Sequence, residues 1–335
     1  MSDSDPSPDT DPDTDPPAPP LFVVMNAGSG STDAEARRAA MKAVFDAADQ
    51  PYELMVVADP SMLSAQARRA VSLARAAGGT VVAAGGDGTI NAVAQQVLGS
   101  GCPLGILPQG TFNYFGRTHG IPTDIEAAAR VLLRARPRPI RVGLVNDRIF
   151  LVNASVGLYP ELLQDREAWK RRFGRNRFVA MLAALATVLR GYRPLRLELD
   201  SGGASGIVRT PTLFVGNNPL QLARIGLPVD TTVGDGRLAA IVVPPLGPMG
   251  LVGLALRGAF GDLGGADTLL RLDVEQLTVR ASRLRRRRRM DVATDGEVAP
   301  LAMPLRFRVA PEPLLLRVPD ADDPDRAPLE HGASG

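Results

Sequence analysis

The sequence contains very little cysteine or histidine, and these shortages exclude several kinds of protein. Cys102 is the only cysteine among 335 residues, so no internal disulfide can form and nothing indicates an oxidising compartment. The two histidines, His119 and His331, do not suggest a histidine-based metal or catalytic site. No basic segment followed by an apolar run opens the chain, and no charge-free apolar stretch reaches the roughly 18 residues that span a bilayer. We therefore expect a cytoplasmic protein that contacts membranes only peripherally.

Charge is distributed unevenly along the chain, which the formal net charge of +2 conceals. Residues 1–20 hold six aspartates and no base, and residues 320–335 hold five acids against one arginine. Neither segment has the apolar residues needed for a core, so we expect two disordered tails. The body between them is consequently basic, which favours nucleotide phosphates, nucleic acid or an anionic membrane surface without choosing among them.

The first half of the body alternates between short apolar runs and longer helical segments. The apolar runs, which we predict to be buried strands, are 21–25, 53–57, 80–84 and 104–107. The predicted helices between them are 33–48, 61–77 and 90–98. This alternation predicts a Rossmann-like α/β domain with a parallel sheet over residues 21–138. Its glycine-rich turns would lie at the carboxyl edge of the sheet, where such folds bind ligands.

The second half has the composition of many short strands separated by glycine, proline and aspartate. These predicted strands are 149–154, 195–199, 212–215, 238–243, 272–279, 305–309 and 314–318. Two helices, 177–190 and 248–260, are predicted to interrupt them. We therefore expect a β-rich, sandwich-like domain over 139–310, followed by a closing strand over 311–319.

The turn after the third predicted strand carries the most chemical information. Three glycines surround one aspartate in Gly85-Gly86-Asp87-Gly88, and Thr89 and a predicted helix follow directly. Glycine lets the backbone approach a ligand closely, and the free N–H groups at a helix N-terminus attract phosphate. Asp87 can hold a metal ion that bridges phosphates, and Thr89 can donate its hydroxyl to a phosphate oxygen. The alternative is a tight turn with an N-capping side chain.

Further motifs along the chain resemble those of one enzyme family. The Gly85–Thr89 turn resembles the nucleotide-binding signature that diacylglycerol kinases, sphingosine kinases and NAD kinases share. Residues 104–117 (LGILPQGTFNYFGR) resemble the next lipid-kinase motif, and residues 26–30 (NAGSG) resemble the motif of its first strand. Asp295-Gly296-Glu297 is similar to the catalytic DGE, and residues 313–319 to the closing strand. On these motifs the chain is identified as a member of the diacylglycerol kinase catalytic-domain family.

The resemblance implies a role for each matching residue. Glu297 would be the general base that takes the proton from a lipid hydroxyl, and Asp87 would be the second catalytic carboxylate. Phosphoryl transfer in general needs positioned phosphates, neutralised charge and a carboxylate near the acceptor. For Glu297 the alternative is a solvated residue in a polar Asp-Gly turn. The residues implied for ATP binding are Asn26, Gly85, Gly86, Asp87, Gly88, Thr89, Asn91, Gly110 and Thr111.

The resemblance also implies a structural magnesium ion. Residues 234–238 resemble the family segment in which an aspartate side chain and backbone carbonyls hold Mg²⁺. Here the ligands would be the Asp235 carboxylate and the carbonyl groups of Thr232 and Arg237. The family's acidic residue after the leucine is Ala239 in this chain, and Asp-Gly is also a common hairpin turn. Metal binding and a plain turn therefore both remain open.

Two departures from the family pattern concern the substrates. The threonine that contacts ATP after the second strand has no counterpart in Val57-Ala58-Asp59. Phe112 and Tyr114 stand where the family usually has a small residue and an aspartate. The loss of the acid at position 114 puts the identity of the acceptor in doubt more than the fold.

Two basic segments are candidates for contact with a lipid surface. Arginine fills six of the seven positions of 283–289, directly before the strand that leads to the Asp-Gly-Glu motif. Trp169 lies in a basic run next to the apolar helix predicted over 177–190. Membrane contact is one interpretation of each. A solvated arginine hairpin and an ordinary core helix are the alternatives, and no nucleic-acid-binding motif accompanies either segment.

The resemblance implies a kinase that uses ATP and Mg²⁺. It would transfer the γ-phosphate to a lipid hydroxyl at the membrane surface, with diacylglycerol as the default acceptor and phosphatidic acid as the product. NAD kinase is a second hypothesis, and a non-catalytic lipid- or nucleotide-binding protein is a third. We expect no nucleic-acid partner, and a homodimer is left open.

Overall fold

The computed structural model describes residues 18–27, 31–158, 160, 194–217, 236–247, 250, 253, 269–281 and 288–328. Of residues 31–34 it describes only the helical backbone. Several predictions lie outside these residues. They concern 28–30, Trp169, the helix over 177–190, most of the helix over 248–260, Thr232, Asp235 and the arginines before Arg288.

The first sheet has the strand order β2-β1-β3-β4-β18-β5. Its strands are β1 (Leu21–Asn26), β2 (Tyr52–Val57), β3 (Thr80–Gly85), β4 (Leu104–Pro108), β5 (Arg136–Ile140) and β18 (Leu314–Val318). The four strands from the start of the chain run parallel, and β3 is completely buried because helices cover both faces. This arrangement confirms the predicted α/β class with a parallel sheet.

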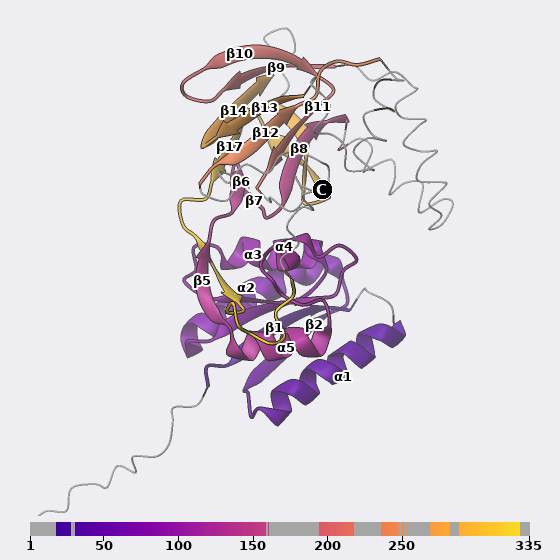
Figure 1. Cartoon of the computed structure of the whole chain (residues 1–335), viewed down its shortest axis with the longest axis vertical. Helices are drawn as coiled ribbons and strands as arrows, with labels where there is room; N and C mark the ends of the chain where they lie inside the picture. Colours follow the sequence, from indigo (N-terminus) through magenta and orange to yellow (C-terminus); the bar gives the residue numbers. More distant parts are fainter. Residues whose placement is uncertain are drawn as a thin grey trace, which may run out of the picture.

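Helices pack on both faces of this sheet (Figure 1). They are α1 (Ser31–Ala47), α2 (Leu63–Ala77), α3 (Asp87–Val97), α4 (Tyr114–Thr118) and α5 (Ile125–Arg134), and a short 3-10 helix η1 (Pro60–Met62) precedes α2. Helices α1 and α5 contact each other on one face, and α2 and α3 contact each other on the opposite face. Among the residues described, no helix is long and apolar enough to cross a membrane.

Two further six-stranded sheets form the β-rich half, in the orders β10-β9-β14-β17-β6-β7 and β13-β12-β11-β8-β15-β16. Their first strands are β6 (Gly143–Val145), β7 (Arg148–Phe150), β8 (Asn153–Gly157), β9 (Leu195–Asp200), β10 (Ser205–Thr210) and β11 (Thr212–Gly216). The remaining ones are β12 (Leu238–Val242), β13 (Leu270–Val274), β14 (Gln276–Ala281), β15 (Arg289–Thr294), β16 (Glu297–Ala302) and β17 (Leu305–Val309). Buried side chains of both sheets form one shared core, which confirms the sandwich-like prediction.

Two predicted strands are each divided in the structure. The segment 149–154 belongs to β7 and β8, and the segment 272–279 belongs to β13 and β14. In both cases the chain leaves one sheet and enters the other. An apolar run gives no sign of such a crossing, because both halves contribute buried side chains to the same core.

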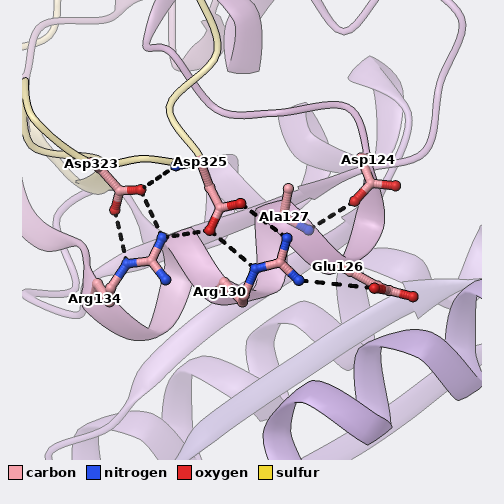
Figure 2. Close-up of polar contacts among 7 residues, drawn as sticks. All are labelled: Asp124, Glu126, Ala127, Arg130, Arg134, Asp323 and Asp325. Atoms are coloured by element: carbon pink, nitrogen blue, oxygen red, sulfur yellow. Dashed lines mark hydrogen bonds and ion pairs between the residues drawn. The ribbon is translucent and has the colours of Figure 1, made fainter.

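The end of the chain returns to the first sheet. Strand β18 runs parallel to β4 and antiparallel to β5, and residues 319–328 then lie along α5. Figure 2 shows how carboxylates of this segment meet the arginines of α5. Asp325 accepts hydrogen bonds from Arg130 and Arg134 at 2.7–3.0 Å, and Asp323 accepts from Arg134 at 2.7 and 3.1 Å. We call residues 319–328 the C-terminal clasp.

Candidate active site

A cavity of about 690 Å³ lies between the start of α3 and the turn that joins β15 to β16. Its lining residues are Asn26, Pro60, Leu63, Ser64, Gly86, Gly88, Thr89, Asn91, Ala92, Gln95, Arg148 and Glu297. They come from the ends of β1 and β3, from α2 and α3, and from the β-rich half. Residues more than two hundred positions apart in the sequence therefore share one cavity.

The glycine-rich turn forms one wall through the first turn of α3. This helix begins at Asp87 after Gly86, so Asp87, Gly88 and Thr89 form its first turn rather than a loop that precedes it. Gly85 has no room for a side chain, because an added Cβ atom would lie 2.5 Å from the Cβ atom of Thr89. The Asn26 amide donates a 3.3 Å hydrogen bond to the Thr89 hydroxyl. The free N–H groups of this turn make it suited to bind phosphate.

The loop after β4 packs directly against this turn. The N–H group of Gln109 donates to the carbonyl of Gly85 at 2.8 Å. Gly110 also lies against Gly86, since an added Cβ atom at Gly110 would be 2.9 Å from the Cα atom of Gly86. Asn113 adopts a left-handed conformation with φ of 50°, and its side-chain amide bonds both the N–H and the carbonyl group of Gly110. The two loops therefore form one tightly packed unit.

Asp87 lies between these two loops. Its Oδ2 atom accepts a 3.0 Å hydrogen bond from the N–H group of Asn113. Its Oδ1 atom is buried and has no hydrogen-bond partner among the residues that the structure describes. Burial raises the pKa of Asp87, and the neighbouring Asp295 carboxylate raises it further, whereas backbone N–H donors at residues 113–115 lower it. The unpaired oxygen is available to a cation or to a proton.

Asp295 fixes the turn that carries Glu297. Its two carboxylate oxygens accept hydrogen bonds of 2.7–2.9 Å from the N–H groups of residues 151–153. A fourth bond of 2.7 Å comes from the side-chain amide of Asn91 on α3. Burial raises the pKa of Asp295, although these donors favour the ionised form and lower it. The carboxylate thus connects three segments of the chain behind the cavity.

Glu297 faces the first turn of α3 from the opposite wall. It is the first residue of β16 and is exposed to solvent. A Cβ atom added at Gly88 would lie 3.5 Å from Glu297 Oε1. Within the described part of the chain its carboxylate forms no hydrogen bond or ion pair. A carboxylate that is accessible and unpaired beside a phosphate-binding turn is suited to accept a proton.

The chain is similar to known proteins, both over its first half and over most of its length. Residues 20–145 match the sequence model of the diacylglycerol kinase catalytic domain. A protein of Pseudomonas putida named "Probable lipid kinase YegS-like" is 32% identical over 261 residues, which is 76% of this chain and 82% of that protein. This chain belongs to the diacylglycerol kinase catalytic-domain family.

The fold of this lipid kinase family member also resembles that of a solved structure, a diacylglycerol kinase from Bacillus anthracis. That likeness has a TM-score of 0.65 and 16% identity over 90% of this chain and 98% of the other.

A third relative matches over a shorter stretch. The diacylglycerol kinase of Bacillus subtilis is 36% identical over 132 residues, which is 37% of this chain and 41% of that protein. Family membership makes this chain a kinase and implies that it uses ATP.

The structure places most of the predicted site residues of the kinase around the cavity. Asn26, Gly86, Gly88, Thr89, Asn91 and Glu297 line it. Gly85 supports the turn from behind, and Asp87 points toward the loop after β4. Gly110 and Thr111 instead line a second cavity of about 430 Å³, whose walls include Phe112, Arg117 and the end of the C-terminal clasp.

Of the three predicted magnesium ligands, the structure describes Arg237. Arg237 directly precedes β12, whereas Thr232 and Asp235 lie outside the described residues. The described residues contain no group of three or more acidic, histidine or cysteine side chains suited to a metal ion.

Six lining residues were not predicted from the sequence, and one of them is Ala92 of α3. Pro60, Leu63 and Ser64 belong to η1 and the start of α2, next to the strand end at which the family's threonine is missing. Gln95 lies on the helix already singled out, two turns from Gly88. Arg148 lies on β7, in a segment of strand composition that carried no functional signal. Only the tertiary fold brings Arg148 to the cavity.

Proposed function

We propose that the enzyme transfers the γ-phosphate of ATP to a lipid hydroxyl, with diacylglycerol as the default acceptor and phosphatidic acid as the product. One observation carries the proposal. The exposed carboxylate of Glu297 lies beside a glycine-rich helix N-terminus in the same cavity, with its Oε1 atom 3.5 Å from the position that a Cβ atom of Gly88 would occupy. Phosphoryl transfer needs these two features together, a phosphate-binding turn and a base near the acceptor.

The nucleotide phosphates would bind at the first turn of α3. The N–H groups there and the positive end of the helix dipole favour anions, and Gly86 and Gly88 leave the backbone accessible. Asn26 and Thr89 are polar lining residues that can bind phosphate oxygens. Pro60 and Leu63 give the neighbouring wall an apolar surface that suits the adenine base.

Asp87 fits a role as a magnesium ligand. Its Oδ1 atom is buried and finds no hydrogen-bond partner in the described part of the chain, so it is free to coordinate a cation. Magnesium in kinases is held by one or two carboxylates together with substrate phosphates and water, so a large acidic cluster is not needed. Bound there, the ion would neutralise part of the phosphate charge during transfer.

Glu297 would act as the general base. The carboxylate takes the proton from the acceptor hydroxyl as the hydroxyl oxygen bonds to the γ-phosphorus. The bond between that phosphorus and the β,γ-bridging oxygen breaks, and ADP leaves with the bridging oxygen. Asp295 stays in its network of four hydrogen bonds and keeps Glu297 at the correct place.

The acceptor would be reached at a membrane surface. Arg288 and Arg289 are exposed where the chain enters β15, the strand that leads to Glu297. Basic side chains near an anionic bilayer are each favourable by about 1 kcal/mol. We therefore propose a cytoplasmic enzyme in peripheral contact with the membrane. Weaker binding to anionic vesicles after replacement of both arginines by glutamine would support the contact, and equal binding would refute it.

The test of the activity uses purified protein, γ-labelled ATP, Mg²⁺ and single lipids in detergent micelles. Diacylglycerol, phosphatidylglycerol, a sphingoid base and ceramide are assayed separately, with NAD in parallel. Label in diacylglycerol supports the proposal in full, and label in another lipid supports the reaction but corrects the acceptor. Label in NAD would replace the proposal by NAD kinase activity, and no transfer to any acceptor would overturn it.

A further inference from the structure

Two side chains of α3 hold the backbone around Arg148 at the cavity. Gln95 Oε1 accepts a 2.8 Å hydrogen bond from the N–H group of Ile149, and Gln95 Nε2 donates to the carbonyl of Asp147 at 3.2 Å. The amide of Asn91 donates to the carbonyl of Ile149 at 3.2 Å. Because Asp147 and Ile149 flank Arg148, three hydrogen bonds fix the base of its side chain relative to α3.

The β6–β7 hairpin that carries Arg148 is also held at its other side. Asn146 occupies the hairpin turn with φ of 55°, a conformation that asparagine tolerates better than most residues. Its amide donates to the carbonyl of Ala302 at 3.0 Å, and its Oδ1 atom accepts from the N–H group of Arg306 at 2.9 Å. The hairpin is thus anchored to both halves of the molecule, which gives Arg148 a defined position.

The charge of Arg148 has no counterpart in the part of the chain that is described. Arg148 is half-buried, and its guanidinium forms no hydrogen bond or ion pair with those residues. Among the described residues that line the 690 Å³ cavity, Arg148 is the only base and Glu297 the only acid. The first turn of α3, which also favours anions, lines the same cavity. The backbone of Arg148 is fixed, and its charge is unpaired within the described residues. Such an arginine suits a ligand that carries several negative charges.

We propose that Arg148 binds the terminal phosphates of the nucleotide and thereby selects a triphosphate over a monophosphate. The inference rests on the proposed ATP site and adds a residue that the glycine-rich turn does not provide. A guanidinium forms paired hydrogen bonds with phosphate oxygens, and its positive charge would neutralise part of the negative charge of the γ-phosphate. Its place on β7 also brings this charge from the β-rich half of the molecule to the α3 wall.

Nucleotide binding to the full chain tests this inference without any lipid acceptor. The affinities for ATP, ADP and AMP are measured by calorimetry for the parent, Arg148→Ala and Arg148→Lys, with Arg196→Ala as the matched control. Arg196 is an exposed arginine of β9 that does not line the cavity. Loss of charge-assisted hydrogen bonds predicts a roughly 10- to 100-fold weaker affinity of Arg148→Ala for ATP. AMP affinity stays nearly unchanged, Arg148→Lys recovers part of the loss, and Arg196→Ala binds like the parent.

The outcomes separate this inference from the proposed kinase reaction. Equal ATP affinity of Arg148→Ala and the parent would overturn the role of Arg148, and so would an equal loss for all three nucleotides. A parent that binds ATP with the predicted dependence on Arg148 but phosphorylates no lipid would overturn the reaction alone. A parent that binds no nucleotide would overturn both. If Arg148→Ala does not fold, the comparison of Arg148→Lys with the parent decides, and identical affinities for all nucleotides would refute the inference.

Discussion

Asn91 and Asp295 are joined by a 2.7 Å hydrogen bond from the asparagine amide to the carboxylate Oδ2 atom, across 204 positions of sequence. Asn91 lies on the helix whose first turn would bind phosphate, and Asp295 lies two residues before Glu297. The bond therefore sets the distance between the two walls of the candidate active site. Asn91 also lines the cavity, so its predicted contact with ATP stays a prediction, and its amide bonds Asp295 and the carbonyl of Ile149.

Replacing Asn91 by alanine should reduce catalysis through the position of Glu297. Asp295 would lose one of its four donors, at a cost of about 1–3 kcal/mol in the free energy of unfolding. We expect a lower kcat and also a weaker ATP affinity, because the amide of Asn91 holds the carbonyl of Ile149 beside Arg148. Asn217→Ala is the control, because Asn217 is similarly buried, bonds the carbonyl of Arg141 and does not line the cavity. An equal decrease of kcat in both variants would show that stability alone is responsible.

Glu297→Gln should nearly abolish phosphoryl transfer. The amide keeps the size of the side chain but cannot accept the hydroxyl proton, and loss of a general base typically costs about 10²- to 10⁴-fold in rate. ATP affinity should stay close to that of the parent. The measurement is initial-rate kinetics beside calorimetric ATP binding, with Glu312→Gln as an exposed control. Normal turnover by Glu297→Gln would remove it from its proposed role.

Asp87→Asn should weaken the use of Mg²⁺–ATP more than it weakens the fold. The amide oxygen can still accept the N–H group of Asn113, whereas the negative charge that would bind Mg²⁺ is lost. We expect a decrease of about tenfold or more in ATP affinity with Mg²⁺, consistent with the loss of one charged ligand. Affinity measured with EDTA should be similar in variant and parent. An equal change under both conditions would contradict the proposed metal contact.

Gly110→Ala should disrupt the packing between the two loops of the site. The added methyl group would lie 2.9 Å from the Cα atom of Gly86, and backbone at that distance has to move. We expect ATP affinity to fall and the free energy of unfolding to decrease by about 1–3 kcal/mol. Gly206→Ala is the control, since an added Cβ atom there meets nothing within 4 Å. If Gly110→Ala binds ATP as the parent does, the close contact is not needed for the site.

Asp325→Asn should weaken the C-terminal clasp in a pH-dependent way. Hydrogen bonds from Arg130 and Arg134 lower the pKa of Asp325 to about 2 from its usual value of 3.8. Its stabilising contribution is therefore complete above pH 3.8 and is lost as the pH falls through about 2. Because the arginines are partly exposed, the effect at pH 7 should be small, on the order of 1–3 °C in Tm.

The control for this prediction is Asp322→Asn, an exposed aspartate of the same segment. Thermal unfolding of both variants and the parent is compared at pH 7 and at pH 3. The decrease for Asp325→Asn should be larger at pH 7 than at pH 3, and Asp322→Asn should match the parent. A decrease that grows toward low pH would contradict the role of the ionised carboxylate.

The parallel half of the fold could be predicted from the sequence because local signals there agree with one another. The predicted strand 80–84 and the glycines that follow it correspond to β3 and to the start of α3. The helix nevertheless begins at Asp87 rather than at the predicted residue 90, because Gly86 caps it and the glycine-rich motif forms its first turn. Glycine has a low helix propensity, which conceals this start in the sequence.

The contacts that assemble the site could not be predicted, because they join distant segments. Nothing near Arg148 in the sequence indicates that Gln95 holds its backbone. The start of the acidic C-terminal segment had the composition of a disordered tail, but arginines of α5 and Arg138 of β5 give it ordered contacts. Motifs report what a segment can bind, whereas tertiary contacts determine which segments meet.

The position of β18 has a consequence for the synthesis of this protein. The strand lies between β4 and β5, so the first sheet has a gap until the residues that form β18 have left the ribosome. A nascent chain that stops after residue 145 carries the whole matched catalytic segment but leaves the facing edges of β4 and β5 unpaired. The nucleotide-binding half is therefore completed last, and expression of that half alone should give aggregated material.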